Sequence, residues 1–385
     1  MRRVTTLERH DWRALAEAKG FLFHTPEGER YWDESAHYAF TLDQVEQDLE
    51  APSAALHELC LAFVGRAVGD ERVLARLRIP GLAWGAIRES WERRDPSLYG
   101  RLDLAYDGMG PAKLLEYNAD TPTALYESAV FQWLWLEDML RRGRLAPGTD
   151  QFNSVHDRLV ARLAPFVGGP LHLACMGDAP EDRGTVAYLE DCAVQAGLET
   201  QLLAVDRIGL DAAGRFVDEA GRTIHRLFKL YPWEWAFADP FGRAVAASAT
   251  RFVEPPWKAV LSNKGLLPCL WEMAPGHPNL LPAYFEDDPA KHRLGASFAR
   301  KPLLSREGAN VLLVRDGAVL ARDDGPYGGE GYVRQALAPL FCSEAGTAVI
   351  GSWIVGDEPA GICVRESYGP ITTNRSRFVP HTIDP

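Results

Sequence analysis

The 385-residue sequence predicts an α/β protein, and three stretches carry this prediction. Apolar residues at 42–77 recur at three- and four-residue spacing, which indicates amphipathic helix on both sides of Pro52. Apolar runs at 171–175 and 201–205 flank a helix-like segment, which is the pattern of a βαβ unit. After residue 309 short apolar runs alternate with glycine-containing turns, as in β-hairpins.

The composition excludes several broad classes of protein. Hydrophobic residues make up 46% and charged residues 24%, which is typical of a globular chain with a large core. The formal net charge of −12 argues against binding to nucleic acid or to an anionic membrane surface. Apolar runs such as 129–136 are far shorter than the ~20 residues needed to cross a bilayer. The length allows two or three lobes or one large enzyme body. Because no linker separates lobes, we treat 1–385 as one unit with soft internal boundaries.

The amino terminus and the cysteines predict a cytoplasmic protein. The basic start at 1–3 lacks the apolar segment of a secretory signal. The cysteines contain no C-x-x-C pair and lie among apolar residues, so we expect reduced, mostly buried thiols and neither disulfides nor a zinc site. They are Cys60, Cys175, Cys192, Cys269, Cys342 and Cys363.

Residues 99–107 and 113–118 both alternate between polar and apolar side chains, and the glycines between them predict a β-hairpin. A turn centred at 109–110 places Asp103 opposite Glu116. Two facing carboxylates repel each other unless a cation lies between them.

The same register places Arg101 opposite Asn118, so four polar groups share one face of the hairpin. Two carboxylates and an amide oxygen are suitable ligands for Mg²⁺. Alternatively, Arg101 neutralises Asp103 and Glu116 in a surface ion network. We favour the metal site, because one arginine only partly offsets three polar neighbours.

The turn at 118–123 carries two hydroxyl groups before a helix-like segment that begins near Ala124 and includes 127–140. Thr121 or Thr123 could cap that helix. The same geometry would also direct hydroxyls and free N–H groups at a bound phosphate or carboxylate.

Glu181 and Asp182 begin the helix of the expected βαβ unit, which ends at Gly197. Ligands of open α/β sheets bind at the carboxyl ends of strands, which is where this pair lies. The simpler interpretation is that both carboxylates complement the helix dipole, and the residues by themselves favour it.

Basic residues and a glycine-rich loop complete the candidate site. Lys264 follows Asn263 at the start of a helix-like segment, and Lys301 and Arg306 lie close together in the chain. With carboxylates and a mobile flap at 325–331, they would suit a nucleotide bound through Mg²⁺. Lysines of this kind are usually solvated, and the glycine-rich segment could equally be a plain surface loop.

Hairpins are expected at 311–314 with 319–321, and at 349–355 with 360–365. The second has a four-residue connection. No P-loop, no G-x-G-x-x-G between a strand and a helix and no G-x-S-x-G is present, so P-loop, Rossmann and serine-hydrolase sites are unsupported.

Five segments resemble the synthetase domain of the glutathionylspermidine synthase and trypanothione synthetase family. They are YGRLDLAYDG…LLEYNADTPT, NKGLLPCLW, RKPLLSREGANV, YGGEGY and GSWIVGDEPAGICVRE. The resemblance covers nearly the whole chain. It implies an ATP-grasp-like synthetase fold with mixed sheets and flanking helices.

The resemblance also implies roles for individual residues. Three would be Mg²⁺ ligands: Asp103, Glu116 and Asn118. Two lysines would contact ATP, together with Arg101: Lys264 and Lys301. Three arginines would hold the phosphates and the developing acyl phosphate: Arg101, Arg306 and Arg365. Four residues would contact the substrates: Thr121 and Thr123, which replace a serine pair of the family, and the acidic pair Glu181 and Asp182.

The implied function is an ATP- and Mg²⁺-dependent acid–amine ligase that forms an amide through an acyl phosphate and releases ADP. Its small-molecule substrates would be a peptide-like, glutathione-like carboxylate and a polyamine-like amine. Bifunctional relatives add an amidase domain, and the length here matches the synthetase part, so no amidase is expected. Two rivals remain: a degenerate nucleotide-binding module, and an enzyme that phosphorylates a small molecule.

Overall fold

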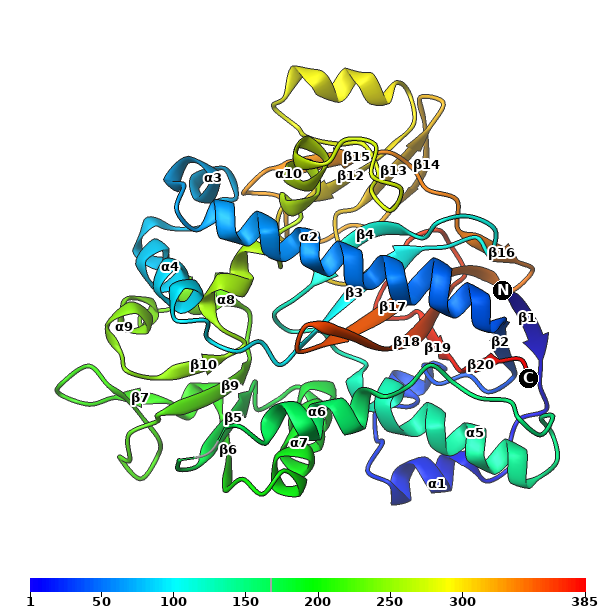
Figure 1. The fold of residues 1–385 in the computed structure, drawn as a ribbon, viewed down its shortest axis with the longest axis horizontal. Coiled ribbons are helices and arrows are strands. Elements are labelled where there is room, and N and C mark those ends of the chain that lie inside the picture. Colours follow the sequence, from blue (N-terminus) through cyan, green and yellow to red (C-terminus); the bar gives the residue numbers. More distant parts are fainter. Residues whose placement is uncertain (167) are drawn as a thin grey trace.

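The computed structural model describes residues 1–166 and 168–385, and it is a mixed α/β fold, as predicted (Figure 1). Its strands form one parallel sheet, two large antiparallel sheets and two small sheets. Figure 1 shows three layers of the molecule. The lower layer contains the parallel sheet and its helices, the middle layer is an antiparallel sheet, and the upper layer contains a second antiparallel sheet.

The central sheet has the strand order β19-β18-β17-β3-β4, with β16 paired to β17. Its strands are β3 (Tyr99–Ala105), β4 (Lys113–Asn118), β16 (Phe341–Ser343), β17 (Gly346–Val355), β18 (Glu358–Ser367) and β19 (Arg377–Val379). The long helix α2 (Ala51–Ala67) crosses in front of this sheet in Figure 1.

Period-two alternation in β3 decides which residues face α2. Leu102 and Leu104 are fully buried in one hydrophobic cluster with Leu56 and Val64 of α2. Because successive side chains of a strand point to opposite faces, Arg101 and the residue two further on, Asp103, face away from α2. The sheet therefore carries its core on one face and its charged groups on the other.

The predicted helices around Pro52 are confirmed. A π-helical segment, Gln44–Glu50, leads directly into α2, and α3 (Glu71–Arg76) follows. The second predicted helix is also present, as a π-helical segment, Glu127–Phe131, continued by α5 (Gln132–Arg141).

The predicted βαβ unit is confirmed in the lower layer. Strand β5 (Leu171–Cys175) leads through α7 (Pro180–Gln195) to β6 (Thr200–Ala204), which pairs parallel to β5. Gly197 has φ +83°, the left-handed conformation that ends helices at glycine. The sheet order is β10-β9-β5-β6, with β9 (Arg226–Leu230), β10 (Arg251–Val253) and the neighbouring α6 (Val155–Leu163).

The upper layer is a five-stranded antiparallel sheet in the order β11-β15-β12-β13-β14. Its strands are β11 (Ala283–Phe285), β12 (Phe298–Pro302), β13 (Leu312–Arg315), β14 (Ala318–Arg322) and β15 (Tyr332–Gln335). The predicted Asp-Gly hairpin is confirmed: Asp316 and Gly317 both have positive φ, as a tight two-residue turn requires.

Two details of the hairpin predictions are corrected. The hairpin of β17 and β18 turns over only two residues, Gly356 and Asp357, because β18 begins at Glu358, two residues earlier than expected. In the β3–β4 hairpin, Asp103 pairs with Glu116, but a β-bulge after Asp103 shifts the following pairs by one residue.

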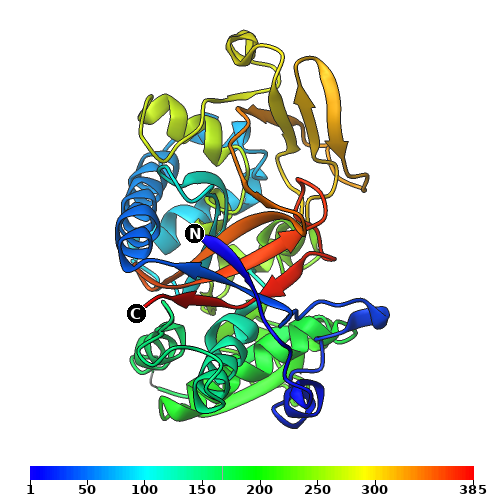
Figure 2. The ribbon, with the colours of Figure 1, turned by 90° about the vertical axis from the view of Figure 1, so that its right-hand side faces the viewer.

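Both ends of the chain meet in one small sheet of order β1-β2-β20, and both termini lie on the same side of the molecule (Figure 2). Its strands are β1 (Arg2–Thr5), β2 (Ala36–Phe40) and β20 (His381–Ile383). The other elements are α1 (Trp12–Ala18), α4 (Trp84–Glu92), β7 (Gly209–Leu210), β8 (Phe216–Val217), α8 (Trp233–Ala238), α9 (Gly242–Ala247) and α10 (Leu266–Met273). Short 3-10 turns are Pro26–Gly28, Gly81–Ala83, Val205–Arg207, Pro256–Val260 and Pro289–Leu294.

Among residues 1–166 and 168–385, no helix combines the length and the apolar character needed to span a membrane. All six cysteines are free thiols. Four are buried, Cys269 is half-buried and Cys342 is exposed, which confirms the expectation of mostly buried thiols.

Candidate active site

Two adjoining cavities contain all twelve residues that the sequence singled out. The first, here called the apolar cavity, has a volume of about 300 Å³ and is lined by Lys264, Lys301 and apolar side chains such as Val311 and Leu313. The second, here called the polar cavity, has a volume of about 250 Å³. Ten predicted residues line it: Arg101, Asp103, Glu116, Asn118, Thr121, Thr123, Glu181, Asp182, Arg306 and Arg365.

The two cavities meet at the β3–β4 hairpin. Asp103, Glu116, Gly308 and Thr372 line both of them. A molecule bound in one cavity would therefore lie next to a molecule bound in the other. The carboxylates of the hairpin stand at that junction.

The polar face of the hairpin forms as predicted. Arg101 Nε donates to Asp103 Oδ1 at 2.7 Å, and Asn118 Nδ2 donates to Asp103 Oδ2 at 2.8 Å. Arg101 also donates through Nη1 to the Thr123 carbonyl, at 2.7 Å. The arginine thus joins the hairpin to the turn that follows it. Burial raises the pKa of Asp103, and the Arg101 guanidinium opposes that shift.

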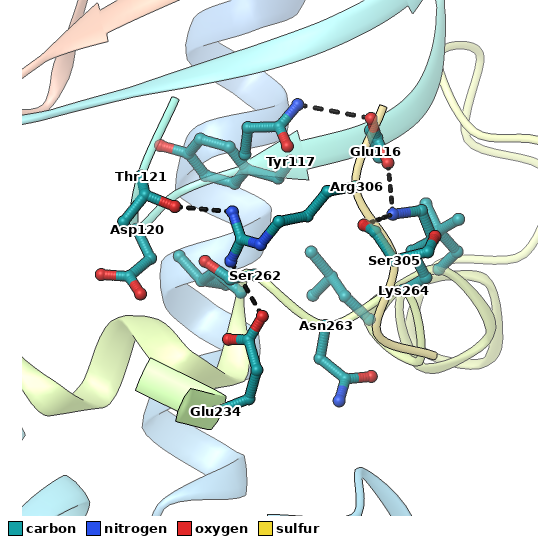
Figure 3. A pocket seen from close by; sticks show the side chains of 14 residues that line it. Glu116, Tyr117, Asp120, Thr121, Glu234, Ser262, Asn263, Lys264, Ser305 and Arg306 are labelled. Atoms are coloured by element: carbon teal, nitrogen blue, oxygen red, sulfur yellow. Dashed lines mark hydrogen bonds and ion pairs between the residues drawn. The ribbon is translucent and has the colours of Figure 1, made fainter. Parts of the chain in front are cut away.

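Glu116 lies between two ammonium groups. Its Oε2 is 2.7 Å from Lys264 Nζ, which also donates to the Ser305 carbonyl at 2.9 Å (Figure 3). Lys301 is buried and donates to the Leu115 carbonyl at 2.9 Å. Burial would raise the Glu116 pKa, but the two lysines lower it to about 2. Burial also lowers the pKa of Lys301 to about 8, against the opposing pull of Glu116.

Arg306 connects the turn at 118–123 with helix α8. Its Nη1 donates to Thr121 Oγ1 at 2.7 Å, and its Nη2 donates to Glu234 Oε1 at 2.8 Å (Figure 3). Its guanidinium carbon lies 5.5 Å from the centre of the Trp235 ring. These contacts hold the charge in one position, so an oxyanion would meet a preorganised cation.

The turn at 118–123 is anchored by a buried ion pair. Asp120 accepts from Lys229 Nζ of β9 at 2.8 Å and from the Trp233 N–H at 2.7 Å. The following π-helical segment has no side-chain cap. The interpretation that Thr121 or Thr123 caps this helix is therefore not borne out, and both residues line the polar cavity instead.

Glu181 and Asp182 occupy the first turn of α7 and line the polar cavity. Burial and the nearby Glu127 carboxylate raise the pKa of Glu181 to about 7. Burial raises the pKa of Asp182 to about 6, although Arg306 opposes the shift. Both carboxyl groups thus lie where a helix dipole is complemented and also border the polar cavity, so the position fits either interpretation.

A third hollow, here called the lateral groove, continues from the polar cavity. It has a volume of about 880 Å³ and shares Phe23 and Glu181 with that cavity. Its walls carry the buried Glu127 and the more exposed Asp157 and Asp191. Five aromatic side chains also line the groove: Phe21, Phe23, Tyr126, Trp133 and Tyr188.

The predicted flap is not part of either cavity wall. Of the described residues, the linings of the apolar and polar cavities include none from 325–331. The Arg306-to-Gly308 segment borders the polar cavity instead, and Glu307 and Gly308 both have positive φ. A Cβ on Gly308 would lie 2.5 Å from the Thr372 carbonyl oxygen, so the close approach of these two loops requires glycine.

Two residues that support the site were missed by the sequence reasoning. Glu234 comes from α8, far from Arg306 in the chain, and no local pattern connects them. Gly351 of β17 pairs with Asp103 of β3, and a Cβ on Gly351 would lie 2.6 Å from Arg101 Cδ. The signal was present, because a glycine inside a strand indicates close approach of another group.

The hairpin residues fit a magnesium ion as far as their chemistry goes. Two carboxylates and one amide share a face and are held close by their mutual hydrogen bonds. In 1–166 and 168–385, no group of three or more His, Cys, Asp or Glu side chains could hold a metal by itself. Mg²⁺ commonly uses one or two carboxylates and completes its shell with phosphate oxygens and water.

The fold is that of the ATP-grasp-type synthetases. A solved glutathione synthetase-like effector from Globodera pallida superposes with a TM-score of 0.54 at 12% identity, over 97% of this chain and 98% of the effector. At that identity the likeness defines the fold alone. It agrees with mixed sheets arranged around adjoining cavities.

The sequence then assigns the family. The family model described as glutathionylspermidine synthase preATP-grasp matches residues 3–384. A Haemophilus influenzae protein with the name acid–amine ligase is 40% identical over 373 residues, 93% of this chain and 92% of its own length. The chain belongs to the glutathionylspermidine synthase family. It is an enzyme, a carbon–nitrogen ligase.

Two further relatives are longer than this chain. Trypanothione synthetase of Crithidia fasciculata is 29% identical over 350 residues, 84% of this chain and 53% of the relative. The bifunctional glutathionylspermidine synthetase/amidase of Escherichia coli is 28% identical over 371 residues, 89% of this chain and 59% of the relative. The chain thus spans little more than half of each of these two relatives.

Proposed function

We propose that residues 1–385 work as one synthetase unit that uses ATP and Mg²⁺ to join a peptide-like carboxylate to a polyamine-like amine. The observation that carries this proposal is the junction of the two cavities at Asp103 and Glu116. Carboxylates at that place stand between a nucleotide on one side and an acceptor on the other. The free thiols support a cytoplasmic location.

The apolar cavity suits the nucleotide base, and the two lysines at its inner end suit the phosphates. Lys264 and Lys301 lie beside the junction, where the γ-phosphate would reach the polar cavity. We assign Mg²⁺ to Asp103, Glu116 and Asn118. When bound, the ion would neutralise phosphate charge and orient the transferred group.

Three arginines would serve phosphoryl transfer from the polar-cavity side. Arg101, Arg306 and Arg365 line this cavity, so the acid's carboxylate can be held while it attacks the γ-phosphate. The resulting acyl phosphate has a good leaving group, which a free carboxylate lacks. Fixed guanidinium groups stabilise the developing negative oxygens without reorganising. Arg101 is placed for this by Asp103 and by the Thr123 carbonyl.

The acidic pair would receive the amine. Glu181 and Asp182 present carboxyl groups at the far side of the polar cavity, and the lateral groove continues beyond Glu181. One amino group could attack the acyl phosphate while a second ammonium group is held in the groove by Glu127 and Asp157. We therefore propose an amine with at least two cationic centres. Thr121 and Thr123 would contact the acid substrate.

The test is an ADP-release screen over pairs of carboxylates and amines with Mg²⁺ present, followed by mass analysis of the products. An amide together with ADP supports the ligase. A stable phosphorylated acid would instead identify a kinase, and nucleotide binding without turnover would identify a degenerate module. The Glu116→Gln variant provides the inactive control for the same screen.

A further inference from the structure

A fourth cavity lies apart from the candidate active site and is rich in arginine. It has a volume of about 510 Å³ and shares no lining residue with the apolar cavity, the polar cavity or the lateral groove. We call it the arginine cavity. Its five arginines come from four segments: Arg93, Arg94, Arg162, Arg226 and Arg251.

This concentration of positive charge is unusual for the chain. Lysine and arginine together account for 41 of 385 residues, and the formal net charge is −12. Five of the eleven residues that line this cavity are arginines, and the one carboxylate among them is Asp95. Outside the lining, Glu89 Oε2 lies 3.4 Å from Arg93 Nη1, and Arg226 donates to the backbone carbonyls of Phe166 and Gly169. The inference of a bound anion therefore rests on Arg94 and Arg162.

Asp95 already forms ion pairs with two of the arginines. Its Oδ2 lies 2.6 Å from Arg93 Nη2, and its Oδ1 lies 3.1 Å from Arg251 Nη1. Arg94, directly after Arg93, has no ion-pair partner among the residues the structure describes. Arg162 donates through Nε to the Ser97 carbonyl at 2.9 Å, which leaves both of its terminal amino groups for another acceptor.

The arginines are held on rigid segments. Arg251 begins β10 in the parallel sheet, and Arg162 lies in the last turn of α6. The Asp95 carbonyl accepts from Trp257 Nε1 at 3.2 Å, which fixes the chain that carries Arg93 and Arg94. The fold fixes the backbone at these positions, so the ordering cost of binding an anion is mainly that of the arginine side chains.

We propose that the arginine cavity binds a phosphate-bearing small molecule. Guanidinium groups match phosphate oxygens in pairs and keep their charge at all physiological pH values. The volume lies within the range of ligand pockets, roughly 300 to 1,000 Å³, and exceeds the need of a bare ion. Phe166 and Phe252 supply apolar walls for the rest of such a ligand.

Position-resolved chemical labelling tests this site in the unmodified protein. Phenylglyoxal reacts with accessible arginines, and peptide mass mapping reports the rate at each one. Inorganic pyrophosphate without Mg²⁺ serves as the probe, at constant ionic strength. Labelling of Arg94 and Arg251 should slow about fivefold or more, as for residues covered by a bound ligand. Arg88, exposed on α4 outside the cavity, is the internal control. Equal slowing at Arg88 and Arg94 would overturn the proposal.

Calorimetry with matched variants provides the second arm. Arg94→Gln combined with Arg162→Gln should weaken pyrophosphate binding at this site by about tenfold or more, because charge-assisted hydrogen bonds are lost. Arg88→Gln should leave it unchanged. Protection of Arg306 reports pyrophosphate in the polar cavity, so the two sites are separated by position. Unaltered affinity in the double variant, together with unprotected Arg94, contradicts the arginine cavity whatever the ligase screen shows.

Discussion

Glu116 on the β3–β4 hairpin and Glu181 at the start of α7 line the same polar cavity, yet their surroundings shift the pKa of the two carboxyl groups in opposite directions. Lys264 and Lys301 hold the pKa of Glu116 at about 2, against the effect of burial. Burial raises the pKa of Glu181 to about 7, and Glu127 adds to the shift.

The difference shows that neighbouring cations outweigh burial at Glu116, whereas burial prevails at Asp103 in spite of Arg101. The hairpin pair has cations beside it, so Glu116 stays charged throughout the physiological pH range. The helix pair has another carboxylate beside it and changes charge near neutral pH. The first arrangement suits a metal bound with phosphate, and the second suits a cation that arrives and leaves.

The largest expected effect comes from removing charge from the hairpin pair. Glu116→Gln should lower ADP release by about 10³-fold, since electrostatic groups aimed at the transferred phosphoryl group contribute on this scale. Circular dichroism should show a retained fold, and the thermal midpoint should fall by a few degrees because the ion pair with Lys264 is lost. Glu58→Gln, at an exposed position of α2, is the control. Substantial turnover in Glu116→Gln would remove this carboxylate from the proposed metal site.

Gly351→Ala should disturb the ion pair between Arg101 and Asp103 without removing either charge. A Cβ at this position would lie 2.6 Å from both Arg101 Cδ and Cys363 Sγ, so the Arg101 or Cys363 side chain must shift, and we expect Arg101 to move relative to Asp103. We expect kcat to fall by about ten- to a hundredfold, because small displacements of catalytic groups are costly. Gly110→Ala is the matched control, since nothing lies within 4 Å of its added Cβ. Equal kcat in both variants would show that Arg101 adapts freely.

Removing charge from Glu181 and Asp182 should weaken binding of the amine and leave binding of the nucleotide unchanged. Glu181→Gln with Asp182→Asn should raise the amine KM about ten- to a hundredfold, as expected for loss of charged partners. The KM for ATP should change less than about twofold. An unchanged amine KM, or a selective loss of the acid substrate, would show that this pair serves the peptide side.

The pH dependence separates the two pairs without a mutation of the hairpin. Below about pH 5 both Glu181 and Asp182 are mostly protonated and neutral, and above about pH 8 both are mostly charged. Affinity for a cationic amine should therefore rise several-fold as pH increases through this window. Binding is measured directly, because the rate of turnover also depends on the protonation state of the attacking amine. The double variant should show a flat profile, and a slope that persists in it would assign the titration elsewhere.

The smallest expected effect is on stability. Because the folded-state pKa of Glu181 lies above its ordinary value of 4.5, the folded protein holds an extra proton between about pH 4.5 and 7. Stability contributed by this group is lost as pH rises through that window. Glu181→Gln should raise the melting temperature by about 1–2 °C at pH 8 and not at pH 4. A decrease at pH 8 would mean that the charged form is stabilised in the fold.

Local sequence patterns were sufficient to predict most of the β3–β4 hairpin and the βαβ unit. Alternation in 99–118, with its glycine-rich turn, predicted that Asp103 faces Glu116, because strand side chains repeat every two residues. The bulge after Asp103 was not predictable, since an extra residue in one strand leaves the alternation of the flanking segments intact.

The sequence by itself determined the α/β class, the family and the twelve candidate residues, because motifs and periodicity are written within short stretches of chain. Only the tertiary structure decided that Arg306 meets Glu234 and that Lys264 neutralises Glu116. The same holds for which segments line the two cavities: among the described residues, none from 325–331 does so, and the predicted ordering of this loop over a nucleotide stays a prediction. Ionisation, close approach and cavity walls depend on which distant segments pack together, and no local pattern records that.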